Sequence, residues 1–122
     1  MNVANEDLVI GLKYEHKVQE RWGLMSAIRD TYLKDYGITP EMSKKIEEYC
    51  KKAKDFEQQL ILNAAQEVYP AIAPYLFFSL TTGVGFDRMG HIPMQRKDFQ
   101  GYRRKTIETY NRYMILNGKQ IV

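Results

Sequence analysis

Apolar residues recur at helical spacing over residues 40–69, and this periodicity constrains the fold more than any other feature of the sequence. Successive members stand three or four residues apart, close to the heptad spacing of packed helices: Met42, Ile46, Tyr49, Ala53, Phe56, Leu60 and Ala64. Thr39 is a good N-cap, Pro40 suits the first turn, and Pro70 prevents the helix from continuing. We therefore expect one long helix over about 40–69.

A second periodic stretch precedes this helix and predicts a long helix over about 6–36. Its apolar stripe consists of Tyr14, Val18, Trp22, Met25, either Ile28 or Arg29, Tyr32 and Tyr36. Gly37 is suited to the left-handed conformation that often follows the end of a helix. Two long helices joined by a short turn form an antiparallel hairpin, and their apolar stripes require a third layer to bury them.

The remainder of the chain supplies that layer. The apolar run 71–80 predicts a short buried helix over about 74–81, because a lone strand there would leave its backbone groups unpaired. A basic C-terminal helix over about 97–117 carries an apolar stripe made of Phe99, Tyr102, either Thr106 or Ile107, Tyr110, Tyr113 and Met114. We therefore predict an all-α antiparallel helical bundle, a single helical domain of residues 1–122, with the loop 81–97 protruding at one end.

Composition places the chain among ordinary soluble proteins. Its 122 residues suit one domain, and 44% of them are hydrophobic. The single cysteine, Cys50, excludes an internal disulfide and favours an intracellular, cytoplasmic location. Neither a basic and apolar leader nor an apolar stretch of about 20 residues is present, so we expect no signal peptide and no membrane contact.

Charge is distributed unevenly along the chain. Residues 88–122 hold eight Lys or Arg and two Asp or Glu, a net charge of +6, whereas residues 1–87 carry −3. Basic residues alternate with aromatic ones in this last third, so lysine and arginine could neutralise phosphates while tyrosines stack on unpaired bases. The competing interpretation is that the aromatic residues belong to the core and the basic ones form a solvated face or pair with the acidic body of the chain.

The segment TTGVGFDRMGHIPMQ, residues 81–95, has the composition of a functional loop. Gly83 and Gly85 begin a dinucleotide fingerprint, but Arg88 stands where the third glycine is needed and no strand precedes them. Asp87 could orient His91 toward a hydroxyl of Ser79, Thr81 or Thr82, the grouping of a small hydrolase. The favoured alternatives are a binding loop, or a loop that folds back over the end of the bundle, with Asp87 capping a turn.

No cofactor or metal is predicted. His16 and His91 are the only histidines, and a helical pairing of His16 with Glu20 falls short of the three or four ligands of a metal site. Lys51 and Lys52 could lower the pKa of Cys50, but an inert thiol is favoured.

The function that these features favour is non-enzymatic binding, most simply of a protein partner, as in small modulators carried by phages and mobile elements. The contact surface would be the 81–97 loop and the basic C-terminal helix, through Arg88, Met89, His91, Met94, Arg96, Lys97, Arg103, Arg104, Lys105 and Arg112. Nucleic-acid binding by the basic third is the first alternative, and a hydrolase using Asp87 and His91 is the second. The 42–64 seam could also face a second copy of the chain, giving a homodimer.

Overall fold

The computed structural model describes residues 28–122, which are helical and contain no strand, so the predicted all-α class is confirmed within this range. The predictions made for residues 6–27, including His16 and the stripe members Tyr14, Val18, Trp22 and Met25, lie outside the described residues. Of the stripe members within the described range, Ile28 is buried and Tyr36 is half-buried, but Tyr32 is 49% exposed, so its assignment to the apolar stripe is wrong. Four α-helices lie between residues 40 and 116: α2 (Pro40–Lys52), α3 (Phe56–Val68), α4 (Ala73–Thr82) and α5 (Arg96–Leu116). Three short 3-10 helices accompany them: η1 (Leu33–Tyr36), η2 (Pro70–Ile72) and η3 (Phe86–Arg88).

The turn before α2 forms as its residues predict. Gly37 adopts the left-handed conformation with φ 78°. Thr39 Oγ1 accepts a hydrogen bond from the backbone N–H of Met42 at 3.2 Å, and Pro40 is the first helical residue. The expected helix to residue 36 is wrong in one respect: residues 28–30 are helical, residues 31 and 32 are not, and η1 then follows.

The predicted continuous helix over 40–69 is also wrong, because the chain bends at Ala53, Lys54 and Asp55. Ala53 is extended, with φ −64° and ψ 146°. Asp55 has φ 49° and ψ −111° and is the one non-glycine residue with positive φ among residues 28–122. Such a conformation costs about 1–3 kcal/mol, which the surrounding packing must offset.

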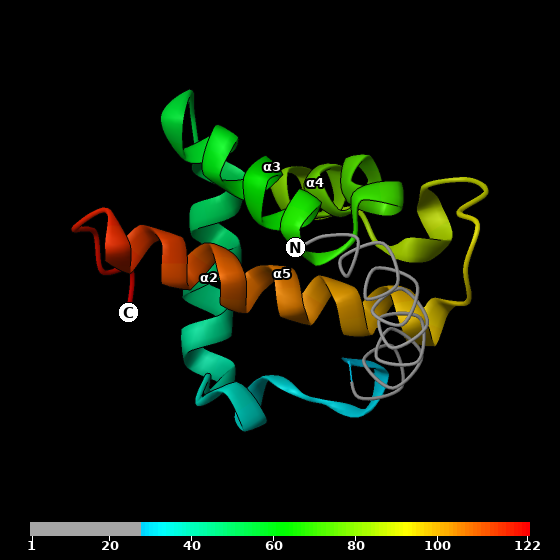
Figure 1. The fold of residues 1–122 in the computed structure, drawn as a ribbon, viewed down its shortest axis with the longest axis horizontal. Helices are drawn as coiled ribbons and strands as arrows, with labels where there is room; N and C mark the ends of the chain where they lie inside the picture. The colour runs from blue at the N-terminus through cyan, green and yellow to red at the C-terminus, as the bar shows by residue number, and fades with distance from the viewer. Residues whose placement is uncertain (1–27) are drawn as a thin grey trace, which may run out of the picture.

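The packing of α3 explains the bend. The predicted seam residues Leu60 and Ala64 are buried, but so are Ile61 and Ala65 beside them, so the apolar face of α3 is broader than one stripe. A helix with a broad apolar face needs neighbours on more than one side. The bend provides them, since it carries α3 between α4 and α5 and leaves α2 to cross the direction of α5 (Figure 1).

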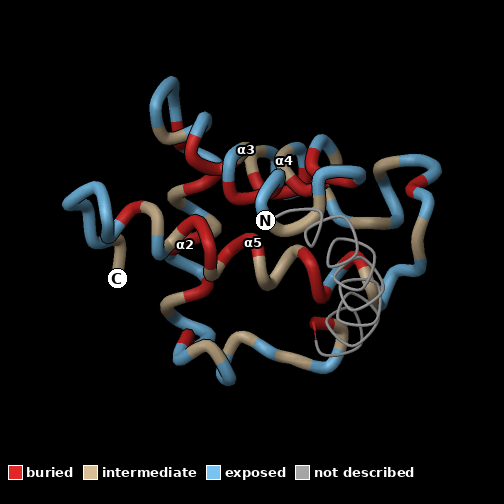
Figure 2. Tube along the Cα trace, viewed as in Figure 1, coloured by how far each residue is buried: buried red, intermediate tan, exposed pale blue. Residues whose placement is uncertain are grey.

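Helix α5 is the common support of the bundle. It contacts α2, α3, α4, η1 and η3. Most of its predicted stripe is buried, as expected: Phe99, Tyr102, Thr106, Ile107, Tyr110 and Met114. The buried segments gather along the facing sides of α3, α4 and α5 (Figure 2). The bounds of α4 and α5 agree with the predicted ranges to within one residue at each end.

Two core clusters share these helices. One joins α2, α3 and the C-terminal half of α5, and contains Ile46, Cys50, Leu60, Ile61, Tyr110 and Met114. The other joins α3, α4 and the first turns of α5, and contains Ile28, Ile72, Leu76, Ile92, Phe99 and Tyr102. The buried members of the predicted 42–64 seam therefore pack against other helices of the same chain. The sequence left open whether the seam faces the same chain or a second copy, and here it faces the same chain.

Gly101 fixes how closely the chain at residues 28 and 29 approaches α5. A Cβ at this position would lie 2.8 Å from the carbonyl oxygen of Ile28 and 2.9 Å from Cα of Arg29. Both atoms belong to the backbone, so neither can move aside as the end of a flexible side chain would. The glycine thus permits a close backbone contact, and any larger residue would force the two segments apart.

We expect Gly101→Ala to lower the free energy of unfolding by about 1–3 kcal/mol, because overpacking outweighs the ~1 kcal/mol gain in helix propensity. Gly85→Ala is the matched control, since a Cβ there meets nothing within 4 Å and φ is an ordinary −85°. Thermal and urea unfolding of both variants measures the effect. Equal stability of the two variants would contradict the close approach.

Candidate functional site

The loop between α4 and α5 is anchored to the core by its own apolar side chains. Helix α4 ends at Gly83, which has φ 79°, and the chain then forms η3. The ring of Phe86 lies 5.4 Å from that of Phe99 in α5, centroid to centroid. Ile92 is only 4% exposed and belongs to the second core cluster. The loop therefore folds back over the end of the bundle, one of the two arrangements that the sequence favoured.

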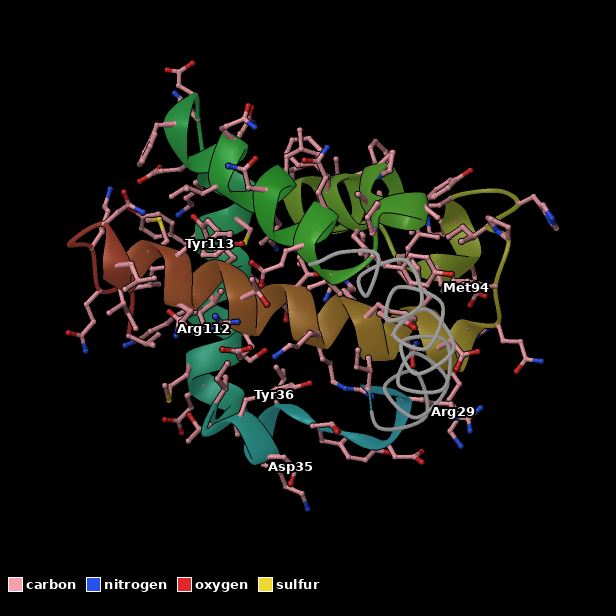
Figure 3. The ribbon with its side chains drawn as sticks, viewed as in Figure 1. Arg29, Asp35, Tyr36, Met94, Arg112 and Tyr113 are labelled. Atoms are coloured by element: carbon pink, nitrogen blue, oxygen red, sulfur yellow. The ribbon has the colours of Figure 1, made fainter. Side chains whose placement is uncertain are left out.

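Two predicted contact residues serve this anchoring. Met89 and Met94 are half-buried and pack against the second core cluster. Figure 3 shows Met94 where the chain returns toward the start of α5. Their side chains stabilise the loop, so little of their surface remains for a partner.

The basic side chains of the loop, by contrast with its apolar ones, are exposed to solvent. Arg88, His91 and Lys97 are exposed, and none forms an ion pair within residues 28–122. Arg96 pairs with Asp87 at 2.5 Å, but both side chains are more than half exposed, so this contact adds at most about 1 kcal/mol. The loop is thus anchored by its apolar residues and exposes its basic ones; we call this surface the loop face and define it as Arg88, His91, Arg96 and Lys97.

The basic residues of α5 have a different role. Arg103 Nη1 lies 2.8 Å from Glu47 Oε1 in α2, and its Nε donates to Ser79 Oγ in α4 at 2.8 Å. Only 22% of the Arg103 side chain is exposed. This guanidinium therefore joins three helices rather than facing solvent.

Arg104 ties α5 to the segment that precedes η1. Its Nε donates to the carbonyl oxygen of Thr31 at 3.0 Å, and its Nη2 to that of Arg29 at 3.1 Å. The guanidinium also lies 4.6 Å from the ring centroid of Tyr32, a cation–π distance. Carbonyl groups left open after the helical residues 28–30 thereby gain a donor.

Lys105 and Arg112 converge on one carboxylate, that of Glu108. Lys105 Nζ and Arg112 Nε lie 2.8 and 2.9 Å from its oxygens, and 16% of the Glu108 side chain is exposed. Burial pushes the pKa of Glu108 upward, but the hydrogen bonds from Arg112 and Lys105 outweigh it and lower the pKa below its usual value. Arg112 and Tyr113 also reach Glu67 of α3, and both lie on the part of α5 that passes α2 (Figure 3).

The hydrolase grouping does not assemble in this structure. Asp87 forms an ion pair with Arg96, and within residues 28–122 it forms no hydrogen bond with His91. Ser79 is buried, and its hydroxyl donates to the carbonyl oxygen of Val84 at 2.7 Å while accepting from Arg103. The hydroxyls of Thr81 and Thr82 likewise donate to carbonyl oxygens of α4, those of Phe77 at 2.9 Å and Phe78 at 2.6 Å. All three candidate hydroxyls are therefore already occupied by structural hydrogen bonds.

The rings proposed to stack on nucleic-acid bases are mostly inside the protein. Phe99, Tyr102 and Tyr110 are at most 3% exposed, and the hydroxyl of Tyr113 donates to Glu67. The competing interpretation of the aromatic stripe, that it belongs to the core, is the one that agrees with these positions.

Cys50 is fully buried, and burial raises the pKa of its thiol to about 12. Arg103 lowers that pKa to a smaller extent, and the adjacent lysines do not activate the thiol. Residues 28–122 contain no group of three or more His, Cys, Asp or Glu side chains placed to hold a metal ion. Nor does any helix in this range have the length and apolar character to cross a membrane.

A groove on α2 was not anticipated from the sequence. It has a volume of about 370 Å³ and is lined by Lys44, Lys45, Glu48, Tyr49, Lys52 and Ile121. The groove depends on the return of the C-terminal residues, through Ile121, to that helix, which no local pattern reveals.

No protein-family model, curated protein or solved structure matches this chain. The arrangement of its own residues is therefore the basis for a functional proposal.

The low pKa of Glu108 gives a pH-dependent contribution to stability. A carboxyl whose pKa is lower in the folded state stabilises the fold above its unfolded pKa, about 4.3, and ceases to do so as pH falls through the folded value. We expect Glu108→Gln to cost about 1 kcal/mol at pH 7, since its two partners are partly exposed. The difference from wild type should vanish toward pH 3.

Urea unfolding at several pH values between 7 and 3 checks this expectation. Glu41→Gln is the control, because Glu41 is exposed and makes no ion pair within residues 28–122. A Glu108→Gln deficit that stayed constant over the whole range would show that the charge of Glu108 is not the source of the stabilisation.

Proposed function

We propose that this protein acts by binding rather than by catalysis, and that its loop face contacts an acidic surface on a partner protein. The observation that carries the proposal is that the basic residues fall into two groups, one with partners within the molecule and one exposed without them. Arg103, Arg104 and Lys105 are engaged inside the molecule, whereas Arg88, His91 and Lys97 are exposed without an ion-pair partner in residues 28–122.

Preorganisation supports the loop as the contact surface. Binding costs less when the contacting groups are already held in place, since less conformational entropy is lost on association. Ile92 and Phe86 hold the loop against the core, so its backbone is fixed before any partner arrives. Exposed like charges on such a scaffold speed association with a surface of opposite charge.

The proposal narrows the surface that the sequence suggested. Arg112 and the three preceding basic residues of α5 stabilise the bundle, and replacing them would weaken the fold together with any binding. Arg88 and Lys97 can be replaced without removing an ion pair, which makes them the cleanest probes of the surface.

We expect Arg88→Glu/Lys97→Glu to abolish capture of the partner in an affinity pull-down from the native host, with nuclease added to the lysate. The control is Lys44→Glu/Lys45→Glu, which makes the same change in net charge on exposed residues of α2 that lack ion pairs in the described chain. Proteins retained by wild type and control but lost from the loop variant, identified by mass spectrometry, are the expected result.

An unchanged set of captured proteins with the loop variant would contradict the proposal. Capture that disappears with nuclease treatment would instead favour the nucleic-acid alternative. Fluorescence polarisation with labelled single-stranded DNA or RNA at two salt concentrations then gives a direct answer, because binding through phosphates weakens steeply with salt.

A further inference from the structure

The bend between α2 and α3 is strained and is not required by the local sequence. Helix α2 ends at Lys52 and α3 begins at Phe56, and neither glycine nor proline occurs between Pro40 and Pro70. Asp55 occupies a positive-φ conformation, and its side chain makes no capping hydrogen bond to α3. The bend therefore lacks two features that normally stabilise such a turn, a glycine at the positive φ and an N-cap.

A straight helix would suit the same residues better. Lys51, Lys52, Ala53 and Lys54 all have good helix propensity, and the apolar spacing of residues 42–64 continues through the bend without a change of period. Phe56, the first residue after the bend, has 59% of its surface exposed, so the bent form leaves a large apolar ring in water.

Few contacts hold α2 and α3 at their present angle. Tyr49 Oη donates to Glu57 Oε2 at 2.9 Å, and Lys119 Nζ lies 2.5 Å from the same oxygen. Apart from the first core cluster, in which both helices take part, α2 packs mainly against α4 and α5, and its Ile46 and Cys50 are fully buried. The helices against which α2 packs thus follow the bend in the sequence. The same helices of another molecule offer α2 the same buried surface.

We propose that the bend straightens and that two copies of the chain exchange residues 28–52, each copy seating this segment on α4 and α5 of the other. Every buried contact of the segment is preserved in such an exchange. The dimer gains relief of strain at both bends and loses the translational and rotational freedom of two separate molecules. Short strained hinges are known to favour this kind of dimer, and its population rises with protein concentration.

One ion pair crosses the boundary of the exchanged segment and provides a direct test. Glu47 belongs to the segment, and Arg103, 2.8 Å away, belongs to the receiving body. A chain carrying Glu47→Arg places two cations together in its closed monomer, and a chain carrying Arg103→Glu places two anions together. In an exchanged heterodimer of the two variants, both contacts again join opposite charges.

We expect the two single variants, co-refolded from denaturant at high concentration, to give a heterodimer. Light scattering coupled to size exclusion measures its mass, and native mass spectrometry shows that it holds one chain of each kind. Each variant refolded alone should give at least about tenfold less dimer. The double variant Glu47→Arg/Arg103→Glu is the control, because it restores the pair within one chain and shows that both positions tolerate the exchange of charge.

A folded double variant together with a mixture that contains only monomers would overturn the proposal. So would dimers formed equally by the mixture and by each variant alone, since that result means association without exchange of the segment.

Substitutions in the bend test the same proposal without altering the ion pair. Asp55→Ala disfavours positive φ and favours helix, so the dimer should bind at least about tenfold more tightly than in wild type. Asp55→Gly has the opposite preferences, and Lys54→Pro holds Ala53 in the extended conformation that it already has, so both should remain monomeric. Sedimentation over a range of concentrations measures all four proteins, and equal dimer fractions among them would refute the hinge.

Discussion

Burial of the apolar face of α5 is the interaction on which the rest of the bundle depends. This face contacts α2, α3, α4 and two of the 3-10 helices, and it contributes the largest fully buried side chains, Tyr110 and Phe99. Complete burial of one large apolar side chain contributes about 1.5–3 kcal/mol. Because these rings fill both core clusters, the helix that carries six of the chain's 18 Lys and Arg residues is also the helix whose exposure would destabilise the fold most.

That constraint accounts for the arrangement of the charges. Arginine and lysine residues flanking a buried face must either reach water along their aliphatic stems or find partners on the neighbouring elements. Arg103 meets Glu47 of α2, Arg104 meets backbone carbonyl groups before η1, and Arg112 reaches Glu67 of α3. The acidic body and the basic last third, which look like separate regions in the sequence, are complementary surfaces within one molecule.

Local sequence signals predicted the elements whose ends are set by local chemistry. Gly37, Thr39 and Pro40 define the turn before α2, because caps and turn residues act within a few positions. The bend at residues 53–55 could not be predicted in this way. It follows from competition for the broad apolar face of α3, and the sequence carried one sign of that face, the adjacent pairs Leu60–Ile61 and Ala64–Ala65.

The roles of the basic residues at the candidate site could likewise be predicted from the sequence only in part. The sequence identified the loop as unusual and its basic residues as exposed candidates, and Arg88 and Lys97 are indeed exposed. It gave no means of separating these two from Arg103 and Arg104, since all four are arginine or lysine near aromatic residues. Only the positions of Glu47, Ser79 and the carbonyl group of Thr31, far away in the sequence, distinguish a structural cation from a free one.

The proposed exchange of residues 28–52 has a consequence for binding at the loop face. The loop joins α4 to α5, both of which stay in the receiving body when residues 28–52 are exchanged, so exchange leaves the loop and its anchors, Phe86 and Ile92, intact. An exchanged dimer therefore carries two loop faces on one particle. A partner that presents repeated acidic surfaces would bind such a dimer more tightly than the monomer without any new contact, because the second loop binds at a high effective concentration. Protein concentration, acting through a strained three-residue bend, would in this way control the strength of binding at a surface that the bend does not touch.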